Sequence, residues 1–172
     1  MNTFQIESTL ESLLYFTKLN LPYYVIAANE LENVKIKSYP CIIIQNCDNL
    51  GQPGSHWIAY FIISPLKTEY FDSYGNDISL YPNVQVPGNI VRENCIALQP
   101  AASETCGHFA IFYVYHRAIG VKYKHILNIL SKSRRKNDKI VKQFINNVAT
   151  NCNSKFKSNC NQCCCSRIKN KY

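Results

Sequence analysis

Three short motifs in this sequence carry the side-chain types that acyl transfer to a cysteine requires. His56 follows a glycine-containing loop, Asp72 lies sixteen residues further on, and Cys106 precedes a long apolar run. A thiol attacks a carbonyl only as the thiolate, so it needs a partner that takes its proton. We therefore interpret Cys106 as a nucleophile, His56 as its base and Asp72 as the acid that orients the imidazole.

Gln99 precedes the cysteine by seven residues and offers a donor for the oxyanion of such a reaction. We expect its side-chain amide and the backbone N–H of Cys106 to hydrogen-bond the tetrahedral intermediate. A helix that begins at Cys106 would also favour the thiolate through its dipole. We expect Trp57 and Gly107 to line the substrate cleft, with Gly107 keeping the turn open for substrate.

Each of these residues taken singly also fits a structural role. A cysteine at a helix start is commonly a packing residue, and an aspartate before Ser-Tyr-Gly is commonly a turn former. The ordered set of histidine, aspartate, glutamine and cysteine is far less frequent by chance, and this set favours the catalytic interpretation.

Apolar segments rich in β-branched residues predict the strands that would position these groups. The segments are 40–45, 56–63, 67–72 and 94–98, and the second and third form a predicted hairpin across Ser64-Pro65. The run after Cys106 is apolar on every side, which predicts a buried helix over 106–119. The pattern indicates an α+β fold, with a small mixed sheet flanked by helices and the nucleophile at a helix N-terminus.

Three further helices are predicted from apolar periodicity, over 5–20, 123–130 and 138–148. Residues 8–11 have the spacing of a capping box for the first of them. The last should face the core with the stripe Ile140, Val141, Phe144, Ile145 and Val148. From about residue 150 the composition changes to Asn, Lys, Ser and Cys, so we expect one domain over 1–149 and a disordered basic tail over 150–172.

Charge is divided unevenly along the chain. Residues 1–116 hold five bases and ten acids, a net of −5, whereas residues 117–172 hold fourteen bases and one acid, a net of +13. The basic third predicts a polyanionic partner, with non-specific DNA as the candidate and a solubilising surface as the alternative. The bases proposed to bind nucleic acid are Lys132, Arg134, Arg135 and Lys136.

Nine cysteines, an odd number, and no visible secretory signal argue against a disulfide framework and for a reducing, intracellular compartment. No apolar stretch is long enough to span a membrane. We assign no metal site, because the tail cysteines lack a second spaced pair or a histidine to complete one. Zinc, palmitoylation and unstructured thiols remain alternatives for Cys152, Cys160, Cys163, Cys164 and Cys165.

The segments that carry these residues resemble the adenovirus endopeptidase (adenain) family, in the wider group of ubiquitin-like-protein proteases. The similar strings are PCIIIQN (40–46), GSHWIAYF (54–61), FDSYG (71–75) and QPAASETCGHF (99–109). Asn137-Asp138 followed by Val141 and Phe144 resembles the terminal helix of relatives from Maverick or Polinton elements and related DNA viruses. Adenovirus enzymes typically use Glu where this chain has Asp72.

The resemblance covers residues 5–148 and implies a papain-like fold in permuted order that cleaves virion precursor proteins. It implies a host nucleus or virion location, no cofactor for the chemistry, and stimulation by an activating peptide and DNA. Cys95 lies too close to Gln99 to inherit the family's peptide-linking role. The alternatives are a deconjugating protease for a ubiquitin-like modifier, an acetyltransferase that uses the same triad, and a non-enzymatic nucleic-acid-binding protein.

Overall fold

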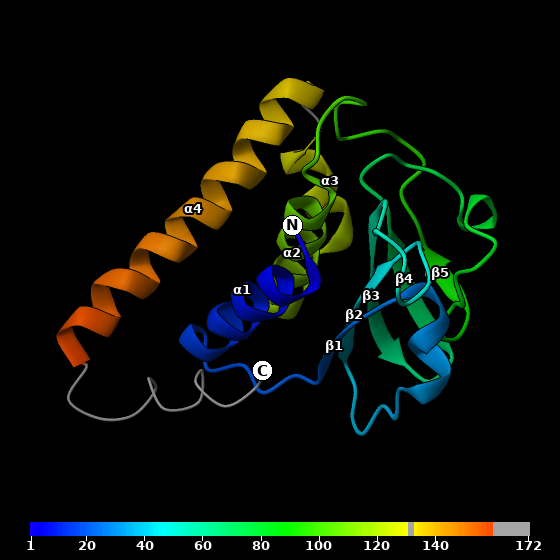
Figure 1. Cartoon of the computed structure of the whole chain (residues 1–172), viewed down its shortest axis with the longest axis horizontal. Coiled ribbons are helices and arrows are strands. Elements are labelled where there is room, and N and C mark those ends of the chain that lie inside the picture. The colour runs from blue at the N-terminus through cyan, green and yellow to red at the C-terminus, as the bar shows by residue number, and fades with distance from the viewer. Residues whose placement is uncertain (131–132, 160–172) are drawn as a thin grey trace.

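A five-stranded mixed sheet forms the centre of the protein, in a computed structural model that describes residues 1–130 and 133–159 and side chains as far as residue 148 (Figure 1). The strands lie side by side in chain order. The outer pairs, β1 with β2 and β4 with β5, are parallel, and the inner pairs are antiparallel. Their bounds are β1 (Tyr23–Ile26), β2 (Cys41–Asn46), β3 (Trp57–Ser64), β4 (Lys67–Phe71) and β5 (Ile90–Arg92).

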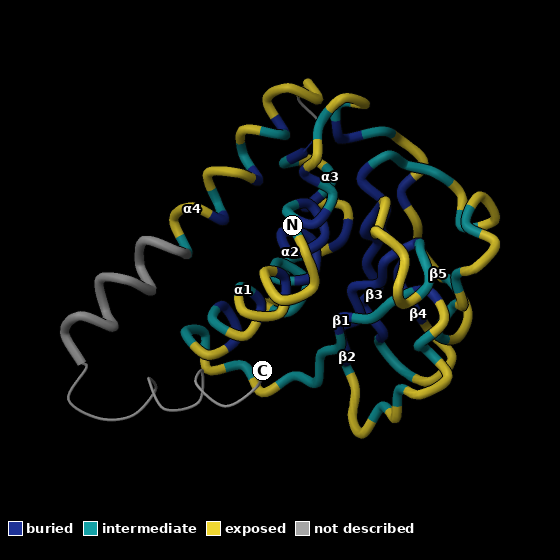
Figure 2. The backbone as a smooth tube through the Cα atoms, in the orientation of Figure 1, coloured by how far each residue is buried: buried dark blue, intermediate teal, exposed yellow. Residues whose placement is uncertain are grey.

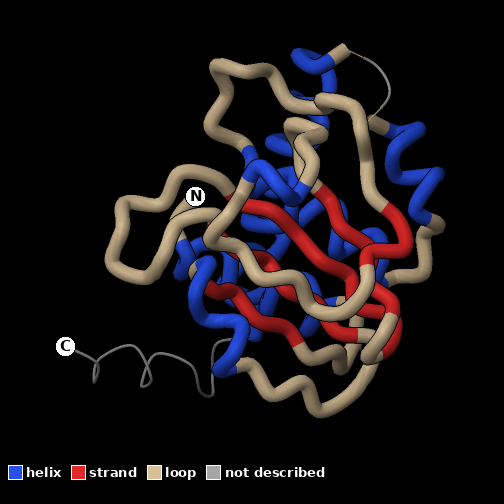
Figure 3. Tube along the Cα trace, turned by 90° about the vertical axis from the view of Figure 1, so that its right-hand side faces the viewer, coloured by secondary structure: helices blue, strands red, loops and turns tan. Residues whose placement is uncertain are grey.

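The sheet buries side chains on both faces because strand residues alternate in direction. Ile42 and Ile44 of β2 belong to the core shared with the helices, whereas Cys41 and Ile43 belong to a second core on the opposite face. Figure 3 shows the strands with the helices behind them and irregular segments in front. This two-sided burial explains why β2 reads as a continuous apolar run in the sequence.

Four helices cover one face of the sheet: α1 (Thr3–Phe16), α2 (Cys106–Ala118), α3 (Tyr123–Ile129) and α4 (Arg134–Asn159) (Figure 1). Helix α2 lies against the sheet with seven of its thirteen residues buried and none exposed, in agreement with its uniformly apolar sequence (Figure 2). Helices α1 and α4 pack on it. The apolar stripe of α4 faces this core as expected, with Val141 and Ile145 buried and the other three partly buried against it.

Helix α1 begins earlier than the sequence suggested. Asn2 is its N-cap and forms a capping box with Gln5, because the Asn2 side chain accepts from the Gln5 N–H and the Gln5 side chain accepts in return. The box expected at residues 8–11 is therefore wrong. Those residues lie inside the helix, where their backbone N–H groups already have partners.

The hairpin over 56–72 is confirmed as β3 and β4. The strand expected over 94–98 is wrong: those residues are irregular, and the short strands β1 and β5 form the sheet edges. Two short 3-10 helices, η1 (Ala28–Asn33) and η2 (Ile78–Leu80), lie in the connections. The backbone of α4 continues through 150–159, which composition had assigned to a tail, while 160–172 lie outside the described residues. No helix in the described part of the chain is long and apolar enough to cross a membrane.

Candidate active site

His56 and Asp72 meet at one end of the β3–β4 hairpin. His56 directly precedes β3 and Asp72 directly follows β4, and the antiparallel register opposes Ala59 to Phe71. A histidine before one strand and an acid after its partner are thereby neighbours. His56 Nε2 donates to Asp72 Oδ1 at 2.6 Å, and both side chains are buried. The pairing expected from the sequence is present.

Four hydrogen bonds fix the Asp72 carboxylate. Besides His56, Oδ1 accepts from the backbone N–H of Tyr74 at 2.9 Å, and Oδ2 accepts from the Asn76 N–H at 3.1 Å and the Tyr81 hydroxyl at 2.8 Å. Burial raises the pKa of Asp72, but the bond to His56, its charge and the other donors outweigh burial and lower that pKa. The acid is therefore ionised at neutral pH.

Asn94 holds the backbone of Asp72 from a segment far away in the chain. Its Oδ1 accepts from the Asp72 N–H at 3.0 Å, and its Nδ2 donates to the Asp72 carbonyl at 2.5 Å. The segment after it passes so close to the acid turn that a Cβ on Gly75 would lie 2.3 Å from the Ile96 backbone. Gly75 also has a φ of +69°, so this turn requires glycine on both counts. The irregular segment 94–98 thus runs directly against the acid turn.

The imidazole of His56 is stabilised in its charged form. Burial alone would lower its pKa, but the hydrogen bond to Asp72, the nearby Cys106 sulfur and the negative charges of both groups raise the pKa to about 9. The ring also stacks on Tyr74 and Tyr81, with centroids 4.7 and 5.8 Å away. These contacts limit the tilt of the ring, so its second nitrogen, Nδ1, keeps a fixed direction.

Cys106 is the first residue of α2, as predicted. Burial raises the pKa of its thiol, but His56 and the backbone N–H groups of Trp57 and Gly107 lower the pKa by a larger amount. Nε2 of His56 is occupied by Asp72, so Nδ1 is the nitrogen left for the sulfur. Nδ1 has no well-aligned hydrogen bond within the protein, and contacts of this kind commonly tighten only when substrate binds.

The side chain of Gln99 is buried and fully engaged. Its Oε1 accepts from Ser73 Oγ at 2.6 Å, and its Nε2 donates to the Ser103 carbonyl at 2.5 Å and to the Tyr74 hydroxyl at 3.3 Å. Its own N–H donates to the Ser73 carbonyl at 2.9 Å. These bonds place Gln99 between the acid turn and the nucleophile segment. To act at an oxyanion, its amide must exchange the long bond to Tyr74 for the substrate oxygen.

No family model matches this sequence, and no curated protein matches it.

Trp57 and Gly107 do not form the open cleft wall that the sequence suggested. The Trp57 indole is buried and donates to the Met1 carbonyl at 3.0 Å. A Cβ on Gly107 would lie 3.2 Å from Ile6 and 3.3 Å from Met1, so the glycine permits α1 and α2 to pack closely instead of opening a turn for substrate. What both residues bring to the site is a backbone N–H beside the sulfur.

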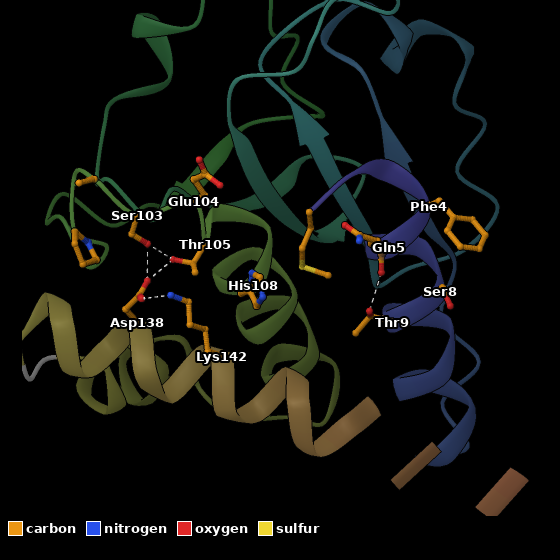
Figure 4. A pocket seen from close by; sticks show the side chains of 13 residues that line it. Phe4, Gln5, Ser8, Thr9, Ser103, Glu104, Thr105, His108, Asp138 and Lys142 are labelled. Atoms are coloured by element: carbon orange, nitrogen blue, oxygen red, sulfur yellow. Dashed lines mark hydrogen bonds and ion pairs between the residues drawn. The ribbon is translucent and has the colours of Figure 1, made fainter. Parts of the chain in front are cut away.

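An open cleft of about 970 Å³ lies beside the nucleophile segment (Figure 4). One wall is α1 and the other comprises α4 and the loop before α2, with His108 at its floor. Thr105 and His108, one residue before Cys106 and two after it, line the cleft, but Cys106 and His56 do not. The cleft therefore borders Cys106 and His56 and does not contain them.

The remaining candidate residues lie apart from the triad in sequence. Arg134, Arg135 and Lys136 are exposed in the first turn of α4, whereas Lys132 lies outside the described residues. In the described part of the chain no three His, Cys, Asp or Glu side chains gather as metal ligands. The tail cysteines, Cys152 included, lie outside the residues whose side chains are described.

The sequence reading missed the residues that support the triad: Ser73, Tyr74, Asn76, Tyr81 and Asn94. The string Asp-Ser-Tyr-Gly-Asn signalled a turn, but it gave no sign that the turn's N–H groups point at the carboxylate. Tyr81 lies directly after η2 in an irregular stretch, and Asn94 is the first residue of the segment that we expected to be a strand.

Proposed function

We propose that this protein is a cysteine endopeptidase with a Cys106–His56–Asp72 triad. One observation carries the proposal: the Cys106 thiol lies at the N-terminus of α2 beside the imidazole of His56, and His56 Nε2 donates to the buried Asp72 carboxylate at 2.6 Å. This arrangement lowers the pKa of the thiol and raises the pKa of the imidazole to about 9. A cysteine and a histidine shifted toward each other's charged forms are the pair that thiol nucleophiles use. A packing cysteine would have its pKa raised by burial, as Cys41 has, to about 12.

The chemistry follows from the two nitrogens of His56. The Cys106 thiolate attacks the scissile carbonyl carbon, and the C=O electron pair moves onto the oxygen. Nδ1 then donates its proton to the leaving amine as the C–N bond breaks, which gives an acyl-enzyme and a free amine. Nδ1 next takes a proton from water, and the resulting hydroxide attacks the thioester carbonyl. The C–S bond then breaks, which releases the acid product and returns Cys106 as the thiolate with the proton on Nδ1. Nε2 remains bonded to Asp72 throughout, which keeps the ring in one orientation.

The oxyanion of each tetrahedral intermediate needs donors near the start of α2. The first N–H groups of any helix have no partner within the helix, and those of α2 have no side-chain cap. We assign the Cys106 N–H as one donor. We assign the Gln99 amide as the second, after it releases the 3.3 Å bond to Tyr74.

We propose further that the fold is papain-like in permuted order and that the enzyme belongs with the adenovirus endopeptidases. The order of base, acid, oxyanion donor and nucleophile along the chain supports this assignment. Precursor proteins of a virus or transposon are the proposed substrates. Non-specific DNA is the proposed partner of the basic face of α4, since its first turn presents three exposed bases.

The test is cleavage of a proteome-derived peptide library, with mass spectrometry of the new termini. The wild type should produce a defined set of cut sites that Cys106→Ala abolishes. Cys95→Ala removes an exposed cysteine outside the site and serves as the matched control that keeps full activity.

Two parallel reactions separate the alternatives. The first substrate is a fusion protein in which a ubiquitin-like modifier ends in Gly-Gly at the junction with its partner, and it should be cut no faster than the library. Faster cleavage at this junction would show that the protein is a deconjugating enzyme. In the second reaction, acetyl-CoA and a lysine peptide should give no acetylated product. An acetylated peptide would show that the triad serves acetyl transfer. A library that is cut equally by wild type and Cys106→Ala refutes the peptidase proposal.

A further inference from the structure

The segment between the proposed oxyanion donor and the nucleophile is held at both ends by the start of α4. At one end, Asn137 Nδ2 donates to the Leu98 carbonyl at 3.0 Å, and both residues are buried. At the other end, Asp138 Oδ1 accepts from the Ser103 hydroxyl at 2.5 Å and from the Thr105 hydroxyl. Two consecutive residues of one helix therefore fix the ends of the segment over 98–105.

Asp138 is the single acidic residue among residues 117–172. Figure 4 shows it at the wall of the cleft, with the two hydroxyls on one side and Lys142 on the other. Lys142 Nζ donates to Oδ2 at 2.7 Å and leaves Oδ1 to the hydroxyls. Burial raises the pKa of Asp138, but Lys142, Ser103 and Thr105 lower it by more. At neutral pH this side chain acts as a hydrogen-bond acceptor only.

Thr105 is the residue on which this contact acts most directly, since it immediately precedes Cys106 and is the N-cap of α2. N-cap threonines normally adopt an extended backbone and turn the hydroxyl back onto a first-turn N–H. Thr105 does neither: its φ and ψ are −103° and 11°, and its side chain makes no cap bond. The hydroxyl goes to Asp138 instead, which leaves the first-turn N–H groups to the sulfur and to the substrate.

We propose that Asp138 is a positioning residue for the nucleophile, which fixes the segment over 98–105 and keeps the Thr105 hydroxyl away from the N-terminus of α2. The inference rests on the peptidase function proposed above. Without the carboxylate, Thr105 is free to relax toward the extended N-cap conformation and to occupy an N–H that the thiolate uses. The same relaxation moves Cys106 relative to His56, and a displacement of about 1 Å costs on the order of 100-fold in rate.

Three substitutions at this position separate positioning from simple stability. Asp138→Ala removes the acceptor. Asp138→Asn keeps an oxygen that accepts from both hydroxyls. Asp138→Glu keeps the charge and the ion pair with Lys142 but displaces the acceptor oxygens by one methylene. It therefore tests whether the position of the carboxylate matters. Gln143→Ala, exposed on the same helix, is the control.

Asp138→Ala and Asp138→Glu should lower kcat by about 10- to 100-fold with KM changed less than about 2-fold. Asp138→Asn should stay within about 3-fold of the wild type. In Asp138→Ala, alkylation of Cys106 by iodoacetamide should require a higher pH, because a competing hydroxyl withdraws donors from the thiolate. Amide exchange across 99–105 should be at least about 10-fold faster. Gln143→Ala should match the wild type in every measurement.

The inference is overturned if Asp138→Glu has the wild-type kcat, or if folded Asp138→Ala loses thermal stability but keeps the wild-type kcat and alkylation profile. Should Asp138→Ala not fold, Asp138→Glu and Asp138→Asn still decide the question. Alkylation and amide exchange need no substrate. An inactive wild type would refute the peptidase proposal, and these two measurements would still decide whether Asp138 positions Cys106.

Discussion

The dependence of the Cys106 thiolate on Asp72 is the most direct consequence of the site geometry. The perturbation is Asp72→Asn, which removes the charge beside His56 and retains the size of the side chain. Burial lowers the pKa of His56, and without the Asp72 charge less remains to offset it, so this pKa should fall from about 9. With a neutral imidazole beside it, the half-buried thiol of Cys106 should need a higher pH to ionise.

The magnitude follows from the pKa of His56. A rise from 6.5 to about 9 corresponds to about 3 kcal/mol in favour of the imidazolium. Asp72 and Cys106 share the interactions that produce this rise, so loss of the carboxylate should remove about 2 kcal/mol. The population of the thiolate–imidazolium pair, and with it the alkylation rate of Cys106 near pH 6.5, should fall about 30-fold.

The assay is site-resolved mass spectrometry of iodoacetamide labelling between pH 5 and pH 9, with exposed Cys95 as the reference in each sample. The wild type should label Cys106 readily well below the pKa of an ordinary thiol. Peptide cleavage should decline above about pH 9, where His56 loses the proton that the leaving amine needs. Asp72→Asn should shift the labelling of Cys106 to higher pH and leave the labelling of Cys95 unchanged.

Asp77→Asn is the matched control, because this exposed aspartate accepts a bond from the Ser79 N–H and does not contact the imidazole. Its labelling profile should equal that of the wild type. If Asp72→Asn folds normally and labels Cys106 at the wild-type rate near pH 6.5, the reasoning is refuted. The carboxylate would then orient the ring without supporting the charge on it.

Three further predictions concern two groups beside the triad and the basic face of α4. Tyr81→Phe removes one of four hydrogen bonds to the triad acid and should lower kcat/KM less than about 10-fold; a loss as large as that of Asp72→Asn would contradict this. Gln99→Ala should lower kcat/KM by the equivalent of about 2–4 kcal/mol. The substitution should also lower Tm, because the hydrogen bonds of Gln99 join two segments. An unchanged kcat/KM would show that Gln99 has only a structural role. Replacing the three exposed bases of α4 with alanine should leave peptide cleavage intact and weaken the salt dependence of binding to duplex DNA. The slope of log affinity against log salt should become shallower by up to about 0.9 for each phosphate that the variant no longer neutralises. If the wild type binds no DNA at about 50 mM salt, the DNA hypothesis is refuted. The bases are Arg134, Arg135 and Lys136, and the charge-matched control replaces Lys35, Lys37 and Lys67.

Much of the scaffold could be read from the sequence because its signals are local. Apolar runs with β-branched residues predicted β2, β3 and β4, and the hairpin brings the base and the acid together through its register. The helix that starts at Cys106 followed from a run that is apolar on every side. Where the local signal was weak, the reading failed: β1 and β5 are short edge strands, and 94–98 has a strand-like composition but an irregular course.

The sequence by itself determined the order of the reactive groups, the hairpin and the buried helix, because periodicity and turn residues encode them within a few positions. Only the tertiary structure decided what holds those groups in place. Asn94 reaches Asp72 across 22 positions, and Asp138 reaches Thr105 across 33. Hydrogen bonds between distant segments leave no periodic trace in a sequence, since a single polar residue in a loop or on a helix looks the same with or without its partner. The packing of the sheet and helices brings these partners within bonding distance.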